Sequence, residues 1–335
     1  MIVVFTGGTG GTKLVQGLQQ MMAPEDSESG FARDRVKELT VIVNIGDDVE
    51  WWGLHVSPDI DSVLYGLADL LSKDRGWGVE GDSFRCLERM KQLGQPAWFS
   101  LGDLDLATHL ARTALLHAGK TLSEATAELA ARFGVRARVL PMSNDRVATM
   151  LDTAKGMLSF QEYFVRERHQ VKVSAVRFEG AEVARPAPGV IESIEQADAI
   201  IFAPSNPVTS IGPILAVPGI RNALRRTPAP VIAVSPIVGG AAVSGPAAEL
   251  MQMMGWPSTS AGVVQAYEDF LDVLVADESE RSAVGSRLAA VSHTKHNSRS
   301  ARVAYTNTIM RSMNDKRDLA AFVLDACAIS EGAKA

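Results

Sequence analysis

The chain has 335 residues, 46% of them hydrophobic, so it can bury one large core or two closely joined ones. Its formal net charge of -6 excludes a broad basic surface for nucleic acid or an anionic membrane, so an anionic ligand must be held by local geometry. Cys86 and Cys327 lie far apart without a CxxC pattern, which favours free thiols in a reducing compartment. The N-terminus runs directly into the apolar residues 2–5 without a basic leader, and no apolar run reaches membrane-spanning length. We therefore expect a soluble, cytoplasmic protein.

Short apolar runs, each followed by a turn and a helix-like period, recur along the chain. The first predicted helix covers 13–22, and strands are predicted at 2–5, 40–45, 198–203, 230–234 and 271–277. Continuous apolar strands that alternate with helices are typical of a parallel sheet covered on both faces. The predicted fold class is therefore α/β, a Rossmann-like doubly wound, mainly parallel sheet whose ligands lie at the carboxyl ends of the strands.

The middle of the chain has a different pattern. Alternating apolar residues at 136–180 predict a small β region, and helix-like stretches precede it at 61–72, 82–93, 104–119 and 122–133. We interpret 61–180 as a mainly helical insertion with a small β region, which interrupts a nucleotide-binding core formed by 1–60 and 181–335. The polar segment 25–37 is predicted to be a surface loop.

A glycine-rich turn follows the first predicted strand. It reads GGTGGTK and contains Gly7, Gly8, Thr9, Gly10, Gly11 and Lys13. Glycines let the backbone approach a phosphate closely, and the helix that follows offers unpaired N–H groups and the positive end of its dipole. The spacing matches neither GxGxxG nor the P-loop, so it predicts a phosphate site without naming the nucleotide. A tight turn without a ligand is the alternative.

Acidic residues cluster after the second predicted strand. Asp47, Asp48, Asp59 and Asp61 lie within fifteen positions, at the expected ligand edge of the sheet. Magnesium takes one or two carboxylates and shares its remaining positions with water and phosphate. The cluster therefore predicts a Mg²⁺ site, with capping of the next helix by Ser57 or Asp59 as the other interpretation.

Two later loops lie at the same edge of the predicted sheet. The first, PSNP at 204–207, presents Ser205 and Asn206 and is followed by Ser210, and the second, SPIVGG, begins at Ser235. Prolines stiffen such turns, while serine and asparagine side chains offer neutral donors and acceptors. Both loops favour recognition of a nucleotide, with simple turn chemistry as the alternative.

The region of the insertion carries further candidates. Three tryptophans lie in this region, Trp51, Trp52 and Trp77. They form either a stacking surface for an aromatic ligand or part of a core. His109 and Arg112 share a helix face, and they are suited to binding a phosphate or carboxylate together or to facing solvent. The aromatic run at 160–166 is strand-like. One of its polar side chains, Gln161, Glu162 or Arg166, is expected to point inward.

Eight ordered motifs together resemble the 2-phospho-L-lactate transferase family of coenzyme F(420) biosynthesis, which includes bacterial phosphoenolpyruvate-transferring members. The motifs are GGTGGTK at 7–13, VNIGDD at 43–48, SPDID at 57–61, LGDLDLATH at 101–109, LPMSND at 140–145, FQEYFV at 160–165, PSNPVTSIGPIL at 204–215 and SPIVGG at 235–240.

The resemblance implies a magnesium-dependent transferase of class EC 2.7.8. In the family reaction, the ribityl hydroxyl of 7,8-didemethyl-8-hydroxy-5-deazariboflavin (Fo) attacks the guanosine-diphosphate adduct of phosphoenolpyruvate or 2-phospho-L-lactate, and GMP leaves. By resemblance, Asp47 and Asp48 hold Mg²⁺, Asp61 lies near Fo, and Asp48 or Asp61 assists deprotonation of the hydroxyl. The insertion would complete the deazaflavin site, and the family suggests a homodimer. Further ligand contacts are expected from the glycine turn with Lys13, and from Ser100, Ser205, Asn206, Ser210 and Ser235.

Two positions depart from the family pattern. Leu104 stands where the family's GDRD motif has arginine, and Asn144 stands where aspartate is common. Each change removes a charge at the expected rim of the site, so the donor acid stays open among phosphoenolpyruvate, phospholactate and phosphoglycerate, with the bacterial character of the chain favouring phosphoenolpyruvate. The alternative function is a non-catalytic, UDP-sugar-binding regulator of the related gluconeogenesis-factor branch. A Rossmann oxidoreductase is disfavoured, because GxGxxG is absent and the acidic cluster would repel a dinucleotide.

Overall fold

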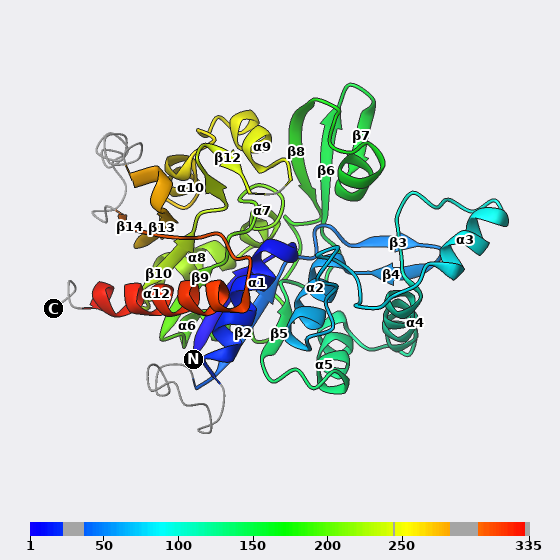
Figure 1. Cartoon of the computed structure of the whole chain (residues 1–335), viewed down its shortest axis with the longest axis horizontal. Helices are drawn as coiled ribbons and strands as arrows, with labels where there is room; N and C mark the ends of the chain where they lie inside the picture. The colour runs from blue at the N-terminus through cyan, green and yellow to red at the C-terminus, as the bar shows by residue number, and fades with distance from the viewer. Residues whose placement is uncertain (23–36, 244, 282–300, 332–335) are drawn as a thin grey trace.

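A parallel sheet forms the centre of the computed structural model (Figure 1), which describes residues 1–22, 37–243, 245–281 and 301–331. Within these residues the sheet has seven strands, and every neighbouring pair is parallel. Their order is β14 (Arg302–Thr306), β13 (Val273–Asp277), β10 (Val231–Val234), β9 (Ala199–Phe202), β1 (Ile2–Thr6), β2 (Leu39–Val43) and β5 (Arg138–Pro141). The predicted α/β class is confirmed.

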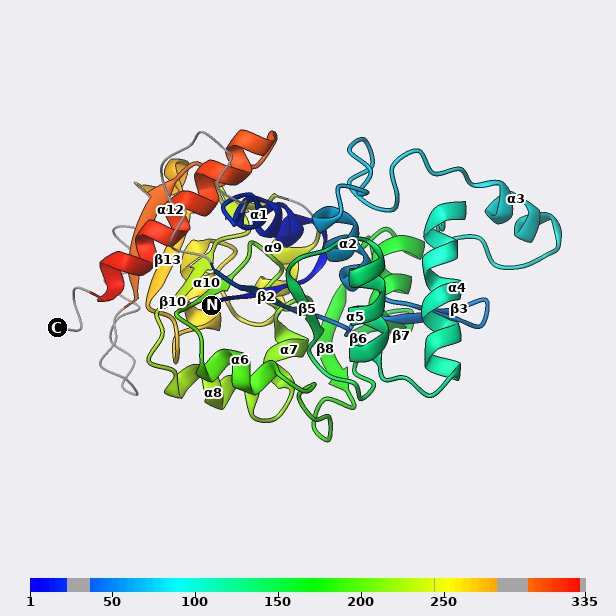
Figure 2. The ribbon, with the colours of Figure 1, turned by 90° about the horizontal axis from the view of Figure 1, so that it is seen from below.

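Helices cover both faces of this sheet, which is why its strands are almost wholly apolar. In Figure 2, α1 (Gly8–Gln20) and α12 (Met313–Glu331) lie on one face, and α6 (Val190–Glu195) and α8 (Ile220–Arg226) lie on the other. The strands between them are buried, and Phe5 of β1 stacks on Phe202 of β9 with ring centroids 4.8 Å apart. Shorter helices complete the cover: α7 (Gly212–Ala216), α9 (Ala247–Met253), α10 (Ser260–Ala266) and the 3₁₀ turn η2 (Glu278–Glu280).

The direction of winding reverses at β1. From β1 the chain moves outward through β2 to β5, and it then returns to the other side of β1 and continues through β9, β10 and β13. In doubly wound sheets ligands bind outside the carboxyl ends of the strands at such a reversal. The loops that follow β1 and β9 are the two walls of this position, and they are the glycine turn and the PSNP loop.

Apart from β5 and α6, the segment between β2 and β9 lies beyond one edge of the central sheet, at the right and top of Figure 1. It contains the hairpin β3 (Val49–Trp51)–β4 (Leu54–Val56), the helices α2 (Pro58–Leu67), α3 (Arg85–Gln92), α4 (Asp103–His117) and α5 (Leu122–Arg132), and the antiparallel sheet β6 (Ala148–Thr153), β7 (Gly156–Ser159) and β8 (Val173–Glu179). A second hairpin, β11 (Ile237–Val238)–β12 (Ala241–Ala242), follows β10. The division into a core and an insertion at 61–180 stays a prediction.

The structure corrects several local predictions. Residues 138–141 were grouped with the small β region, but β5 pairs with β2 and is an edge strand of the central sheet. The aromatic run predicted to be strand-like forms a π-helical turn, η1 (Glu162–Arg166), in which Glu162 and Arg166 form an i,i+4 ion pair. Helix α1 begins at Gly8, five positions before its predicted start at 13. Most of the predicted loop at 25–37 lies outside the described residues. None of the helices described is long and apolar enough to cross a membrane.

Candidate functional site

The glycine turn and the PSNP loop contact each other at the point where the winding reverses. Ser205 accepts a hydrogen bond from the Gly7 amide at 3.2 Å and donates one to the Gly7 carbonyl at 2.9 Å. A Cβ on Gly11 would lie 1.9 Å from Thr6 Oγ1 and 2.6 Å from Ser205 Oγ, so only glycine permits this approach. Helix α1 starts here without a side-chain cap and without acidic residues in its first turn. The Gly8 amide donates a hydrogen bond to the Asp59 carboxylate, and the other first N–H groups of the helix are available to an anion.

Asp59 faces this turn from the first turn of α2. Its Oδ2 would be 2.6 Å from a Cβ on Gly7, and its Oδ1 would be 3.3 Å from one on Gly8, whose φ of +61° favours glycine. Asn44, at the end of β2, donates a hydrogen bond to Asp59 Oδ2 at 2.9 Å. Neither Ser57 nor Asp59 caps α2 with its side chain, so that interpretation is wrong. Asp59 instead places a buried carboxylate beside the expected phosphate position.

Asp47 lies at the same edge, at the end of the loop after β2. Its Oδ1 is buried, and no group among the described residues forms a hydrogen bond with it. Burial raises the pKa of Asp47 well above its ordinary value, and the charges of Asp59 and Asp48 raise it further. Burial also raises the pKa of Asp59 to about 7, with a contribution from the charge of Asp48. These groups therefore concentrate more negative charge than their surroundings compensate, which is the property of a cation site.

One carboxylate oxygen of Asp48 has two polar partners. Its Oδ2 accepts a hydrogen bond from Ser57 Oγ at 2.8 Å and lies 3.0 Å from His55 Nε2. Its Oδ1 is buried without a partner in the part of the chain that the structure describes. Burial raises the pKa of Asp48, while His55 and Ser57 act in the opposite direction. Of the two predicted metal ligands, Asp47 is the carboxylate whose negative charge is less well compensated by its neighbours.

Asp61, unlike Asp59, does not face the glycine turn. It points toward α4, where its carboxylate is paired with the guanidinium of Arg112, and its Oδ2 lies 3.5 Å from His109 Nδ1. Both α4 residues are buried, so they do not form a solvated helix face. The carboxylate that they contact together is the protein's own Asp61, and their contact with a ligand stays a prediction.

The other predicted contact residues divide into two groups. Thr9 and Gly10 lie in the first turn of α1, and a Cβ on Gly10 would be 3.0 Å from the Pro204 carbonyl oxygen. Lys13 is half-buried on α1, and Ser210 lies beside Gly7, so both belong to the same neighbourhood.

Asn206 and Ser235 are occupied within their own loops. Asn206 Oδ1 accepts the Val208 amide at 2.9 Å. The Ser235 hydroxyl is buried and contacts the backbone of Ile237 and the hydroxyl of Ser260. Ser100 is exposed in the loop before α4. Their roles as ligand contacts stay predictions.

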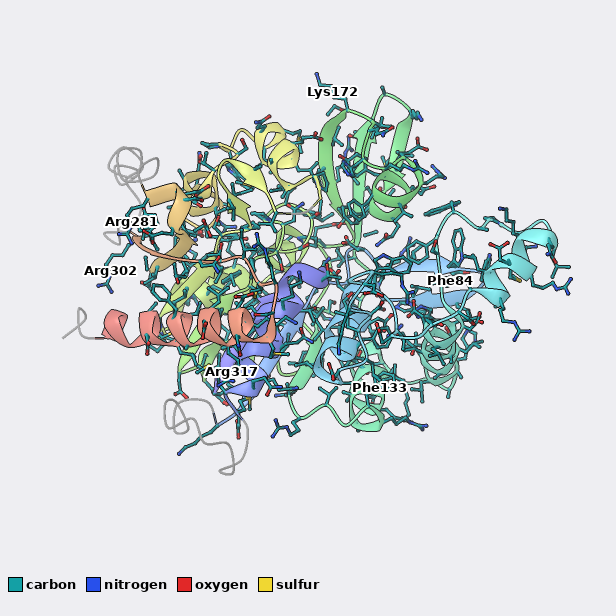
Figure 3. All side chains as sticks on the ribbon, viewed as in Figure 1. Phe84, Phe133, Lys172, Arg281, Arg302 and Arg317 are labelled. Atoms are coloured by element: carbon teal, nitrogen blue, oxygen red, sulfur yellow. The ribbon has the colours of Figure 1, made fainter. Side chains whose placement is uncertain are left out.

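The tryptophans form two separate groups. Trp51 packs against Trp98 and Phe99, with ring centroids 4.7 and 5.8 Å away, and Trp52 completes this cluster beside the β3–β4 hairpin. Trp77 lies instead with Phe84, which is marked in the insertion in Figure 3. Of the two alternatives, the core holds for Trp51, and the three tryptophans do not form a single stacking surface. The partners of Trp51 come from a loop that sequence periodicity did not single out.

The two departures from the family pattern have local explanations. Asn144 Oδ1 accepts hydrogen bonds from the Ser123 amide and hydroxyl, both at 2.8 Å, at the start of α5. Leu104 is 52% exposed in the first turn of α4, and its amide is bound by Asp82. Asn144 thus has a capping role that does not require a negative charge.

Two residues of the insertion join the site, and the sequence singled out only one of them. Gln161, at the start of η1, donates a hydrogen bond to the Asp47 carbonyl at 3.3 Å, which meets the expectation that one polar residue of this run points inward. Thr149 of β6 approaches Gly46, where an added Cβ would lie 2.6 Å from its hydroxyl. Neither contact has a signal in the local sequence, because each joins elements more than 100 positions apart.

Comparison with known proteins identifies the family of the chain. Residues 2–312 match the family model described as 2-phospho-L-lactate transferase CofD. A 2-phospho-L-lactate transferase of Methanosarcina mazei is 40% identical over 97% of this chain and 100% of its own length. A phosphoenolpyruvate transferase of Streptomyces griseus is 44% identical over 84% of this chain and 87% of its own.

Solved structures support the fold. A crystal structure of a UPF0052-family protein from Bacillus halodurans superposes with a TM-score of 0.59, 17% identity and 98% coverage of both chains. The relatives with higher identity are named transferases, and their similarity extends over both walls of the site and the insertion. The chain therefore belongs to the 2-phospho-L-lactate transferase CofD family.

Proposed function

We propose that this protein is the transferase of coenzyme F(420) biosynthesis that moves a phosphoenolpyruvate or 2-phospho-L-lactate moiety from its guanosine-diphosphate adduct to Fo and releases GMP. The observation that carries the proposal is the juxtaposition of an uncapped helix N-terminus with buried, incompletely compensated carboxylates. A helix N-terminus attracts phosphate, whereas Asp47 and Asp59 repel it. A divalent cation between them would reconcile the two.

The residues present fit Mg²⁺. Carboxylate oxygens are its preferred protein ligands, and Asp47 Oδ1 is a buried oxygen without a partner among the described residues. We assign Asp47 and Asp59 to the metal, with Asp48 beside them. When bound, Mg²⁺ would neutralise the diphosphate and the carboxylates, which is the chemistry that phosphoryl transfer requires.

The protein's own groups then orient the reactants. The turn from Gly7 to Gly11 holds the diphosphate against α1, and Ser205 fixes the turn. The Fo hydroxyl oxygen forms a bond to the phosphorus that carries the organic acid, and the bond from that phosphorus to the bridging oxygen breaks. GMP departs with the electron pair, and the hydroxyl proton passes to a carboxylate. Asp48 suits this role, because burial raises its pKa and makes it a better proton acceptor.

Mass spectrometry of the products tests the proposal. The purified protein is incubated with Fo, Mg²⁺ and the guanosine-diphosphate adduct of phosphoenolpyruvate, 2-phospholactate or phosphoglycerate. We expect GMP and the deazaflavin phosphodiester in equal amounts. Asp47→Asn should lower turnover by about 10²–10³-fold, the usual effect of losing electrostatic stabilisation, whereas Asp318→Asn, at an exposed position of α12, should not. Binding of UDP-sugars without any transfer to Fo would overturn the proposal in favour of a regulatory protein.

The protein's state in the cell is also part of the proposal. We expect a cytoplasmic homodimer, which light scattering of the purified protein and fractionation of cells can check.

A further inference from the structure

A second buried charged cluster joins the core to the insertion. It contains Asp61 and Tyr65 from α2, and Asp105, His109 and Arg112 from α4. None of these residues is more than 7% exposed, and the Arg112 side chain is fully buried. Since a buried charge is costly without a partner, this cluster must be balanced internally.

Arg112 contacts three elements at once. Its Nη1 donates to Asp61 Oδ2 at 3.1 Å, and its Nη2 donates to Asp61 Oδ1, so the pair is bidentate. Nη1 also lies 3.5 Å from the His55 carbonyl oxygen, in strand β4. The guanidinium thus ties α2 and the β3–β4 hairpin to α4.

The cluster resembles a metal site in its composition alone. One ligand atom from each of Asp61, Asp105 and His109 lies within 4.8 Å of the others. However, Arg112 occupies both oxygens of Asp61 and lies 3.3 Å from His109 Nδ1, which must accept because a guanidinium only donates. His109 Nε2 lies 3.3 Å from Asp105 Oδ1. The cation of this cluster is therefore the guanidinium.

The remaining member of the cluster, Tyr65, lies between the other members and α5. Tyr65 donates a hydrogen bond to Asp105 Oδ1 at 2.8 Å, and its ring packs against Phe133, marked at the end of α5 in Figure 3. Burial raises the pKa of Asp105, but His109 and Tyr65 outweigh it, and the pKa lies below its ordinary value. Asp105 is thus held as an anion that orients His109.

We propose that Arg112 is a positioning residue of the transfer reaction and that Asp61 is its buried counter-ion rather than the general base. The inference rests on the proposed function. Asp61 lies one half-turn beyond Asp59 on α2, so the pair fixes the helix that presents Asp59 to the glycine turn. The contact with His55 fixes the hairpin that follows Asp48 and carries Trp51. Arg112 therefore fixes α2, which carries Asp59, relative to the β3–β4 hairpin of the insertion, which we propose completes the Fo site.

Steady-state kinetics of two arginine variants test the positioning role. Arg112→Lys keeps the charge but loses the two-pronged geometry. We expect the KM for Fo to rise roughly tenfold with a smaller change in kcat, since the lost interaction orients the acceptor. Arg132→Lys is the matched control, because Arg132 is an exposed arginine of α5 paired with Glu128, and it should behave as wild type. An unchanged KM for Fo in Arg112→Lys would overturn the positioning role.

A double-mutant cycle tests the role of Asp61. Asp61→Asn or Arg112→Gln alone leaves an uncompensated buried charge, whereas the double variant leaves a neutral amide pair. We expect the double variant to exceed the Asp61→Asn variant in kcat by about tenfold. No recovery in the double variant would identify Asp61 as a group that acts on the substrate and would overturn the proposal.

Thermal unfolding of the same four proteins separates this inference from the proposed function. The double variant should unfold at a higher temperature than either single variant, whether or not Fo is the acceptor. Strictly additive decreases would overturn the pairing. Absence of transfer to Fo by the wild-type protein, with the coupling intact, would refute the proposed function while leaving the pairing supported.

Discussion

Asp59→Asn should stabilise the metal-free protein above neutral pH. The asparagine keeps the shape of the side chain and an oxygen that can accept the hydrogen bond from Asn44, but it removes a charge from the crowded edge of the sheet. The substitution therefore isolates the electrostatic cost of the cluster from its packing.

The magnitude follows from the pKa of Asp59. Burial and the charge of Asp48 raise it from 3.8 to about 7, so ionising this group costs roughly 4 kcal/mol more in the folded protein than in the unfolded chain. The folded state binds the proton more tightly, so this contribution is fully present below pH 3.8 and is lost as the pH rises through about 7. Relative to Asp59→Asn, the wild-type protein should lose up to about 4 kcal/mol across this window.

Thermal unfolding in EDTA between pH 5 and 8 provides the assay. The wild-type midpoint should fall with pH more steeply than that of Asp59→Asn, and Asp318→Asn should follow the wild type. Adding Mg²⁺ at about 100 times its dissociation constant should restore roughly 2.7 kcal/mol to the wild type and much less to Asp59→Asn. Parallel pH profiles for the two proteins, or equal stabilisation by Mg²⁺, would refute the reasoning.

Three further substitutions test other parts of the site. In Gly11→Ala the added Cβ would lie 1.9 Å from Thr6 Oγ1, so the protein should be destabilised by about 1–3 kcal/mol. Calorimetry should also show weaker binding of the guanosine-diphosphate donor, and an unchanged donor affinity would contradict the phosphate-binding role of the turn. Ser205→Ala should cost about 1–3 kcal/mol in unfolding free energy, because the buried Gly7 amide and carbonyl lose their shared partner. Asn144→Ala should cost about 1 kcal/mol through loss of the hydrogen bonds to Ser123 in the first turn of α5 and leave the ratio of kcat/KM values among the donor acids unchanged, so an altered ratio would place this residue at the substrate.

The fold was predictable where the apolar pattern is continuous. Strands β1, β2, β9, β10 and β13 are buried apolar runs with turn residues at their ends, and all were located from the sequence. Strand β14 has a mixed pattern, because it is an edge strand with only partial burial, and it was missed. Strand β5 was recognised as a strand but assigned to the wrong sheet, since pairing with β2 depends on contacts nearly 100 positions apart.

The site was predictable in composition more than in geometry. The sequence located the glycine turn and Asp47 and Asp48, because each follows a buried strand, and it located Asp59 and Asp61 by their place in the same acidic cluster. It could not distinguish Asp59 from Asp61, which differ by half a turn on α2 and face opposite partners. The partner of Asp61 is Arg112, 51 positions away, and no local pattern predicts which carboxylate a buried arginine will meet.

The orientation of Asp59 on α2 affects how the metal and the donor bind. Asp59 directs its charge toward the N-terminus of α1, so the diphosphate and the carboxylates of Asp47 and Asp59 compete for the positive end of this helix. A cation that binds both removes the competition, so its affinity and that of the donor must rise together by the same factor. Asp61 contributes nothing to this coupling, because its charge is already balanced by Arg112. The coupling between metal and donor should therefore weaken in Asp59→Asn, where Asp47 remains, and persist when Asp61 and Arg112 are replaced together by Asn and Gln, which titration calorimetry of each ligand with and without the other can measure.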